Sequence, residues 1–250
     1  MNEFLEGGRT GIYKHDDFVF RPTEIWTEYI HLFLRYLHSQ GFDKAPFPFG
    51  IDKVGIEKIS YLKGNVYNEL LPEDAKSDEA LISLSILMKQ FHDIGEEYAK
   101  KLTGKEKWML PPRSPNETMC HGDLAPYNIV MEGKKVIGII DFDTLHPGPR
   151  MWDIAYSLYR WIPLMSPDNP ENFGSEEDKH RRLSLFINTY GLDSIDNQEI
   201  IQWVVQRLEY LVSFMEREAT SGNITFKKHI ENGHLEQYQR DLKYLELFWG

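Results

Sequence analysis

The sequence predicts an α+β protein in which a short strand-rich part precedes a longer helical part. Between residues 12 and 62, short apolar runs alternate with turns rich in Gly, Pro and Asp, a pattern typical of strands. From residue 79 onward most apolar residues recur with the 3.6-residue period of helices that pack on a core. The chain has 250 residues and is 41% hydrophobic, which is enough for one large domain or two small lobes.

The first part contains short apolar runs separated by polar or Gly-containing turns, at residues 4–5, 12–14, 18–21, 49–51 and 56–62. Between the third and fourth runs, apolar residues from Ile25 to Tyr36 fall on one helical face, which Pro22 precedes and Gly41 ends. We therefore expect residues 1–62 to form a small lobe of five strands and one helix.

The remainder, residues 63–250, is predicted to be a mainly helical lobe. Its helical patterns cover residues 79–100, 152–161, 179–190, 198–219 and about 226–247. Two strand-like pieces, residues 128–131 and 136–140, are joined by a Gly-containing turn that predicts a hairpin. A boundary at residues 62–66 would place a cleft between the lobes, where ligands often bind.

Charge and cysteine content exclude several classes of protein. The net charge of −11 argues against a nucleic-acid partner, which would require a basic face. Cys120 is the only cysteine, so no internal disulfide can form, and we expect it to be a small buried residue. No apolar run approaches the ~20 residues that span a bilayer, and the first residues do not resemble a signal peptide. We expect a cytoplasmic protein without a membrane partner; the oligomeric state stays open.

One motif combines residues that could transfer a phosphoryl group. In HGDLAPYNIV, His121, Asp123 and Asn128 have the spacing of a protein-kinase catalytic loop, with Gly122 where those kinases have Arg. Asp123 could orient an alcohol and accept its proton, and Asn128 offers an amide oxygen to Mg²⁺. Asp141, at the end of the strand over residues 136–140, could be the second metal ligand. Asp143 could support the metal or the fold, or make a turn.

The blocks HGDLAPYNIV, VIGIIDFD and PGPRMWDIAYSLYRW together resemble the aminoglycoside phosphotransferase-like family of small-molecule kinases, which includes choline kinase-type members. The resemblance covers nearly the whole chain and implies a bilobal, protein-kinase-like fold. It also implies transfer of the γ-phosphate of ATP (or GTP), with Mg²⁺, to a hydroxyl of an aminoglycoside-like antibiotic, an amino alcohol or a sugar. The alternative is a kinase-like nucleotide-binding regulatory module with little or no turnover.

The resemblance implies roles for individual residues. Asp123 would be the catalytic residue, and Asn128 and Asp141 would be the magnesium ligands. His121 would brace the loop, and Asp153 would hold the loop's backbone.

The resemblance also places the nucleotide on the first lobe. Gly7 and Gly8, in the segment GGRTG, would lie over its phosphates. The backbone around Ser60 and Leu62, where the lobes would join, would bind the adenine edge.

Arg21 departs from the protein-kinase pattern, which has Lys on the third strand. Arginine can bind phosphate with two donors at once, so Arg21 is a candidate phosphate ligand. The other reading is an exposed residue at the end of a strand. Glu24 and Glu28 are candidates for its acidic partner, although both are closer in sequence than the family pattern leads us to expect.

The acceptor side is less specific. Acidic residues between positions 168 and 178 could hold a cationic substrate, or could simply begin a helix capped by Ser175. The long polar loop over residues 163–178 is a candidate substrate lid. The nature of the acceptor stays open.

Overall fold

The computed structural model describes residues 3–5, 11–68, 70–192 and 194–249, and the chain forms two compact units, Met1–Arg150 and Met151–Gly250. The boundary expected at residues 62–66 lies inside the first unit. The division into lobes of residues 1–62 and 63–250 therefore stays a prediction. Gly7 and Gly8 lie outside the described residues.

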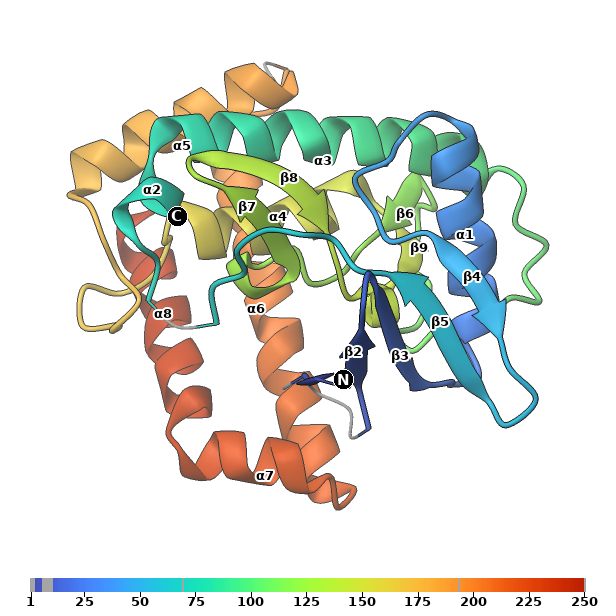
Figure 1. Ribbon diagram of the computed structural model, residues 1–250. Helices are drawn as coiled ribbons and strands as arrows, with labels where there is room; N and C mark the ends of the chain where they lie inside the picture. Colours follow the sequence, from blue (N-terminus) through green and yellow to red (C-terminus); the bar gives the residue numbers. More distant parts are fainter. Residues whose placement is uncertain (1–2, 6–10, 69, 193, 250) are drawn as a thin grey trace. The chain divides into compact units, whose positions relative to one another are not determined.

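The first unit begins with a five-stranded antiparallel sheet in the order β1-β2-β3-β5-β4 (Figure 1). Its strands are β1 (Glu3–Phe4), β2 (Tyr13–His15), β3 (Phe18–Pro22), β4 (Pro48–Ile51) and β5 (Ile56–Ser60). The five predicted strands are thus confirmed. In the ladder between β3 and β5, Arg21 lies directly opposite Glu57, so both side chains project from the same face of the sheet.

Helix α1 (Thr27–Ser39) follows β3 and is the one helix predicted among these strands. It buries Ile30, Phe33, Leu34 and Leu37, which recur at helical spacing, and the chain leaves the helix through Gly41 at φ +83°. The helix begins several residues after Pro22 because Pro22 belongs to β3.

Helix α3 (Asp78–Ala99) is the longest element of the first unit, and the short helix α2 (Glu73–Lys76) precedes it. The Ser77 hydroxyl accepts a hydrogen bond from the Ala80 N–H at 3.2 Å and caps α3. Phe91 is fully buried, and its ring lies 5.7 Å from that of Phe33 on α1 and 6.1 Å from that of Phe142. Phe91 therefore connects α3 to the segment that carries Asp141 and Asp143.

Two small antiparallel ribbons flank residues 121–128, the segment with the spacing of a kinase catalytic loop. The predicted hairpin is β7 (Ile129–Glu132) with β8 (Lys135–Ile139). The second ribbon, β6 (Thr118–Cys120) with β9 (His146–Gly148), was not predicted, because each strand has three residues and the second reads His-Pro-Gly. Cys120 is buried, as expected, and pairs with His146. This pairing brings residues 121–123 alongside residues 141–145.

The second unit is helical, with the helices α4 (Arg150–Trp161), α5 (Glu176–Tyr190), α6 (Asn197–Thr220), α7 (Ile224–Glu231) and α8 (His234–Phe248). The single helix predicted for residues 226–247 is wrong in one respect: Gly233, at φ +84°, separates α7 from α8. The antiparallel sheet and the mainly helical remainder together confirm the predicted α+β class.

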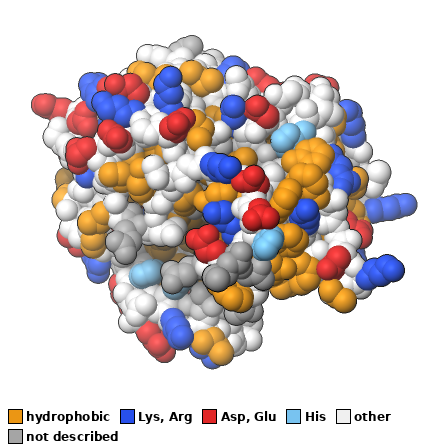
Figure 2. All heavy atoms as spheres, in the orientation of Figure 1, with side chains coloured by type: hydrophobic (Ala, Val, Ile, Leu, Met, Phe, Trp, Pro, Cys, Tyr) orange, Lys and Arg blue, Asp and Glu red, His pale blue; other side chains and the backbone are white. Residues whose placement is uncertain are grey.

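The described residues also show the character of the helices and of one face of the surface. None of the described helices combines the length and the apolar character that a membrane span requires. On the face drawn in Figure 2, acidic and basic side chains are interspersed among hydrophobic ones, and among the residues described there neither sign forms a continuous stripe.

We expect Phe91→Ala to lower the free energy of unfolding by about 3–5 kcal/mol, because the substitution leaves a cavity among the packed rings of Phe33 and Phe142. Ile86→Ala on the same helix is the matched control, since Ile86 is 46% exposed; it should cost less than about 1 kcal/mol. Urea denaturation of both variants measures the difference. Equal midpoints would contradict the assignment of Phe91 to the core.

Candidate active site

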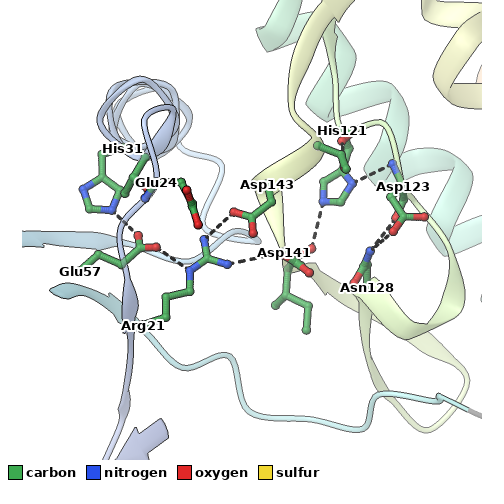
Figure 3. Close-up of polar contacts among 12 residues, drawn as sticks. Arg21, Glu24, His31, Glu57, His121, Asp123, Asn128, Asp141 and Asp143 are labelled. Carbon is green, nitrogen blue, oxygen red and sulfur yellow. Dashed lines mark hydrogen bonds and ion pairs between the residues drawn. The ribbon is translucent and has the colours of Figure 1, made fainter. Parts of the chain in front are cut away.

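Asp123 is held by the short loop that follows β6. The Asn128 Nδ2 amide donates to the Asp123 carboxylate Oδ2 and to the Asp123 main-chain oxygen, both at 2.9 Å (Figure 3). Pro126 begins a 3₁₀ turn, Pro126–Asn128, that folds the loop back on itself and makes this contact possible. The amide nitrogen of Asn128 faces Asp123, so its Oδ1 is the atom that can bind a cation. Asp123 and Asn128 are therefore brought together as the motif predicts.

Gly122 is required by two features of this loop. Its φ is +85°, a left-handed conformation that glycine adopts without strain. A Cβ at this position would lie 2.7 Å from the Thr144 carbonyl oxygen, closer than non-bonded atoms approach. The loop thus packs directly on the segment after Asp141, and this explains the Gly at the position where protein kinases have Arg.

His121 connects the two halves of the site. Its buried ring donates from Nε2 to the Ile140 carbonyl at 2.9 Å and accepts at Nδ1 from the Asp123 N–H at 3.3 Å. The ring also packs edge-on against Phe142, with centroids 4.9 Å apart. With both ring nitrogens engaged, His121 acts as a brace between Asp123 and the strand end at Ile140. These contacts agree with the structural role that the sequence suggested.

Asp141 adopts a backbone conformation that is rare for residues other than glycine. Its φ and ψ are +59° and +71°, and its side chain is 48% exposed. Asp tolerates the left-handed region better than most residues, but the conformation still stores strain, and such strain is concentrated at functional sites. The turn points the carboxylate toward Arg21 (Figure 3), whose Nη1 lies 3.3 Å from Asp141 Oδ1.

Arg21 is the centre of a cluster of carboxylates. It is only 7% exposed, which excludes the alternative of a solvent-exposed residue at the strand end. Its Nε donates to Glu57 Oε1 at 2.6 Å, and its Nη2 lies 3.3 Å from Asp143 Oδ1. With the contact to Asp141, three carboxylates surround one guanidinium (Figure 3). Asp143 therefore supports this cluster.

Glu57 and His31 were not found from the sequence. Neither Glu24 nor Glu28 is the hydrogen-bonded partner of Arg21; Glu57 is, from the neighbouring strand β5. Glu57 is fully buried, and its Oε2 accepts from His31 Nε2 on α1 at 2.7 Å. A glutamate within a strand-like stretch, Ile56-Glu57-Lys58-Ile59, was the available signal, but only the register of β3 and β5 identifies its partner.

The charges within this cluster keep Glu57 and Arg21 ionised despite their burial. Burial by itself would raise the pKa of Glu57, but the hydrogen bond from His31 and the charge of Arg21 outweigh burial, so that the pKa is lowered from its usual value. Burial would lower the pKa of Arg21, whereas the charges of Asp143, Glu57 and Asp141 raise it above the usual value. Both groups are therefore ionised at neutral pH.

The donor set of this site fits a magnesium ion. Asn128 and Asp141 offer an amide and a carboxylate oxygen, the hard ligands that Mg²⁺ prefers, and Mg²⁺ commonly takes only one or two protein ligands beside phosphates and water. Within the described ranges, no three His, Cys, Asp or Glu side chains gather in a way that could hold a metal ion by themselves. A second ligand source, such as a nucleotide, would complete the coordination.

Ser60 and Leu62 differ in what their main chains can offer a nucleotide. The Ser60 N–H donates to the Phe47 carbonyl at 2.9 Å, so it is used inside the sheet. In the part of the chain that the structure describes, the Leu62 N–H and C=O make no hydrogen bond. The Leu62 side chain packs on Gly138 of β8, where a Cβ would lie 2.8 Å from it. Leu62 is thus the better placed of the two.

The second unit fixes the loop that was proposed as a substrate lid. Asp241 of α8 is fully buried and accepts from Tyr159 Oη at 2.7 Å, Ser166 Oγ at 2.6 Å and Asn169 Nδ2 at 2.8 Å. The sequence did not identify this residue. Through Ser166 and Asn169 it anchors the first part of the loop to α8.

The acidic residues of the same loop are largely neutralised. Ser175 accepts from the Asp178 N–H at 3.1 Å and caps α5, so Glu176, Glu177 and Asp178 form the start of a helix, whereas the other two acids, Asp168 and Glu171, lie before it. Their ion pairs lie within the unit: Asp168 with Arg240, Glu171 with Arg160, Glu176 with Lys179, and Asp178 with Arg181. These pairs favour the helix-start interpretation over a site for a cationic substrate.

Asp153, which was expected to hold the backbone of the loop over residues 121–128, lies on α4 and is fully buried. Its role stays a prediction.

Comparison with known proteins relates the chain to phosphotransferases, as the motifs in its sequence do. The model of the phosphotransferase enzyme family matches residues 23–181. A trifolitoxin immunity protein of Rhizobium leguminosarum bv. trifolii is 26% identical over 194 residues, which are 74% of this chain and 72% of that protein.

Solved structures show the fold. An amicoumacin kinase, in complex with AMP-PNP, Ca²⁺ and amicoumacin, superposes with a TM-score of 0.64 at 14% identity, covering 93% of this chain and 88% of its own. The choline kinase LicA of Streptococcus pneumoniae superposes with a TM-score of 0.59 at 15% identity, covering 99% of this chain and 94% of its own.

We expect Glu57→Ala to destabilise the protein by about 3 kcal/mol, because it removes one partner of a buried ion pair and leaves the other charge poorly compensated. The matched control is Glu97→Ala, which removes an exposed ion pair with Lys100 and should change stability by less than about 1 kcal/mol. Thermal and urea unfolding measure both effects. A Glu57→Ala variant as stable as the control would contradict the central place of this pair.

Proposed function

We propose that this chain, which belongs to the phosphotransferase enzyme family, transfers the γ-phosphate of ATP (or GTP), with Mg²⁺, to a hydroxyl of a small molecule. The family and the fold it shares with small-molecule kinases make the chain a small-molecule phosphotransferase. One observation carries the proposal further: Asn128 fixes the Asp123 carboxylate, and His121 joins the Asp123 main-chain N–H to the strand end before Asp141.

Asp123 is the proposed catalytic residue. Its carboxylate would accept a hydrogen bond from the acceptor hydroxyl and orient the oxygen toward the γ-phosphorus. As the new P–O bond forms and the bond to the leaving nucleoside diphosphate breaks, the hydroxyl proton passes to Asp123. The Asn128 amide keeps this carboxylate in one orientation, so that alignment of the two reactants provides much of the rate.

Asn128 and Asp141 are the proposed magnesium ligands. Bound Mg²⁺ supplies positive charge that neutralises the phosphate oxygens during transfer. The strained backbone of Asp141 supports this assignment, because such strain is concentrated at functional sites and the carboxylate faces Arg21. His121 supports it as well, since it fixes Ile140, the neighbour of Asp141, relative to the catalytic loop.

Arg21 is the proposed phosphate-binding residue of the first sheet. A guanidinium has five N–H donors, and the contacts with Glu57, Asp141 and Asp143 use one nitrogen each. The second N–H of each terminal nitrogen can still donate to phosphate oxygens. Leu62 and Ser60 are proposed to face the nucleotide base, with Gly7 and Gly8 over the phosphates.

The acceptor is proposed to be a hydroxylated small molecule of the kinds phosphorylated by the related kinases. The names of the superposed proteins indicate an antibiotic and an amino alcohol, and the sequence relative is named for immunity to trifolitoxin. The direct test is ADP release with MgATP and a panel of aminoglycosides, amino alcohols and sugars. Phosphorylation of at least one class, identified by mass spectrometry, is the expected result.

The second candidate is a nucleotide-binding regulatory module with little turnover. The engagement of Arg21 by three carboxylates favours it, because those contacts compete with phosphate. The two candidates differ in one result: thermal stabilisation by MgATP without ADP release across the whole panel would support the module over the enzyme.

Asp123→Asn should keep MgATP binding and lower phosphate transfer by about 10²–10⁴-fold, because an amide cannot accept the proton. Thermal shift with MgATP and ADP release measure the two properties separately. Asp43→Asn, an exposed position outside the site, is the control and should resemble the wild type. Unchanged turnover in Asp123→Asn would remove Asp123 from the mechanism.

Asp141→Asn should weaken MgATP binding at least about tenfold, since the loss of one charged ligand corresponds to more than ~1.4 kcal/mol. Asn tolerates the left-handed backbone, so the fold should be kept. Calorimetric titration with ATP, with and without Mg²⁺, measures the effect, and chelation of Mg²⁺ should bring the wild type to the level of the variant. Normal MgATP affinity in the variant would refute the ligand assignment.

A further inference from the structure

The hydroxyl of Tyr127 occupies a place beside the proposed catalytic carboxylate. Tyr127 Oη donates to Asp123 Oδ1 at 2.8 Å, while Asn128 holds Oδ2 of the same carboxylate. An acceptor hydroxyl must form this kind of hydrogen bond with Asp123 before transfer. Tyr127 therefore already presents an alcohol oxygen in the position that the reaction requires of its acceptor.

The backbone fixes Tyr127 in this position. It lies within the 3₁₀ turn Pro126–Asn128, in which the Asn128 N–H donates to the Ala125 carbonyl at 2.9 Å. The Ile140 N–H donates to the Asn128 carbonyl at 2.9 Å, which ties the turn to the end of β8. Pro126 and Asn128 are buried, whereas Tyr127 is half-buried. The turn is therefore anchored on both sides of Tyr127, whose side chain remains partly accessible.

The chemistry of Tyr127 suits phosphate transfer. A phenolic hydroxyl gives up its proton more readily than an alkyl alcohol, so a neighbouring carboxylate can accept that proton as the oxygen attacks phosphorus. An oxygen within ~2.6–3.2 Å of a carboxylate satisfies the geometric condition for general-base assistance. The same carboxylate and the same bound nucleotide would thus serve both reactions, with a hydroxyl oxygen as the attacking atom in each.

We propose that Tyr127 is an internal phosphate acceptor, which the chain phosphorylates in cis from a bound nucleoside triphosphate; this rests on the proposed function. Tyr127 Oη forms a bond to the γ-phosphorus, and the bond from that phosphorus to the bridging oxygen of the nucleoside diphosphate breaks. The phenolic proton passes to Asp123 Oδ1. The products are the nucleoside diphosphate and phosphotyrosine at position 127.

The test uses the purified full chain with MgATP and no added small molecule. Intact-mass measurement should show the gain of one phosphate, and peptide sequencing by mass spectrometry should place it on Tyr127. Because the transfer is intramolecular, the labelled fraction at a given time should not depend on protein concentration. The phosphate should survive hydroxylamine, which would remove an acyl phosphate from an aspartate.

Three variants separate the proposal from its alternatives. Tyr127→Phe should lose the label and keep thermal stabilisation by MgATP, which shows that the variant folds and binds nucleotide. Asp123→Asn should lower the labelling rate by about 10²-fold or more, although Tyr127 is intact. Tyr36→Phe is the matched control: the Tyr36 hydroxyl contacts Lys101 on the surface, and this variant should label like the wild type.

Each other outcome overturns the proposal in an identifiable way. A chain that phosphorylates a small hydroxyl compound while Tyr127 stays unmodified would retain the proposed function and refute the internal acceptor; Tyr127 would then only brace Asp123. Label that persists in Tyr127→Phe would assign the acceptor to another residue. A wild-type chain that neither binds MgATP nor becomes labelled would refute both proposals.

Discussion

A buried guanidinium surrounded by three carboxylates is the interaction on which the candidate site depends. Arg21 lies inside the protein, where an isolated charge would be strongly unfavourable. Its contacts join the two paired strands β3 and β5 through Glu57, and they extend to Asp141 and Asp143 at the end of β8. His31 adds α1 to the same network. The orientation of Asp141 is therefore coupled to the packing of the sheet.

The loop over residues 121–128 is fixed by a separate set of hydrogen bonds and close contacts. His121 spans from Asp123 to Ile140, and Gly122 permits the close approach of the loop to Thr144. One side of the site is thus organised by charge and the other by close packing. They meet at residues 140–144, which explains why these few residues combine a left-handed backbone, a buried phenylalanine and two carboxylates.

Whether a feature could be predicted from the sequence depends on how far apart in the chain the interacting residues lie. Asp123 and Asn128 are five residues apart, and the strands of the β7–β8 hairpin are neighbours in sequence. Their spacing in the sequence was therefore enough to predict both features. Glu57 is 36 residues from Arg21, and its role depends on strand register, which a single sequence does not specify. The ribbon of β6 and β9 was missed because its three-residue strands carry little pattern, and the break at Gly233 was masked by apolar residues on both sides. The helix start at Ser175 was recognised because capping is a local signal.

The pairing of Arg21 with Glu57 also limits how the first sheet can change in evolution. Neighbouring residues of a strand face opposite sides, so a single-residue insertion in β3 or β5 would turn one member of the pair away from the other. Two-residue insertions would preserve the facing but displace the partners along the ladder. Length variation among homologues should therefore collect in the turns and at the outer strand β4, leaving the central pair of strands constant in length.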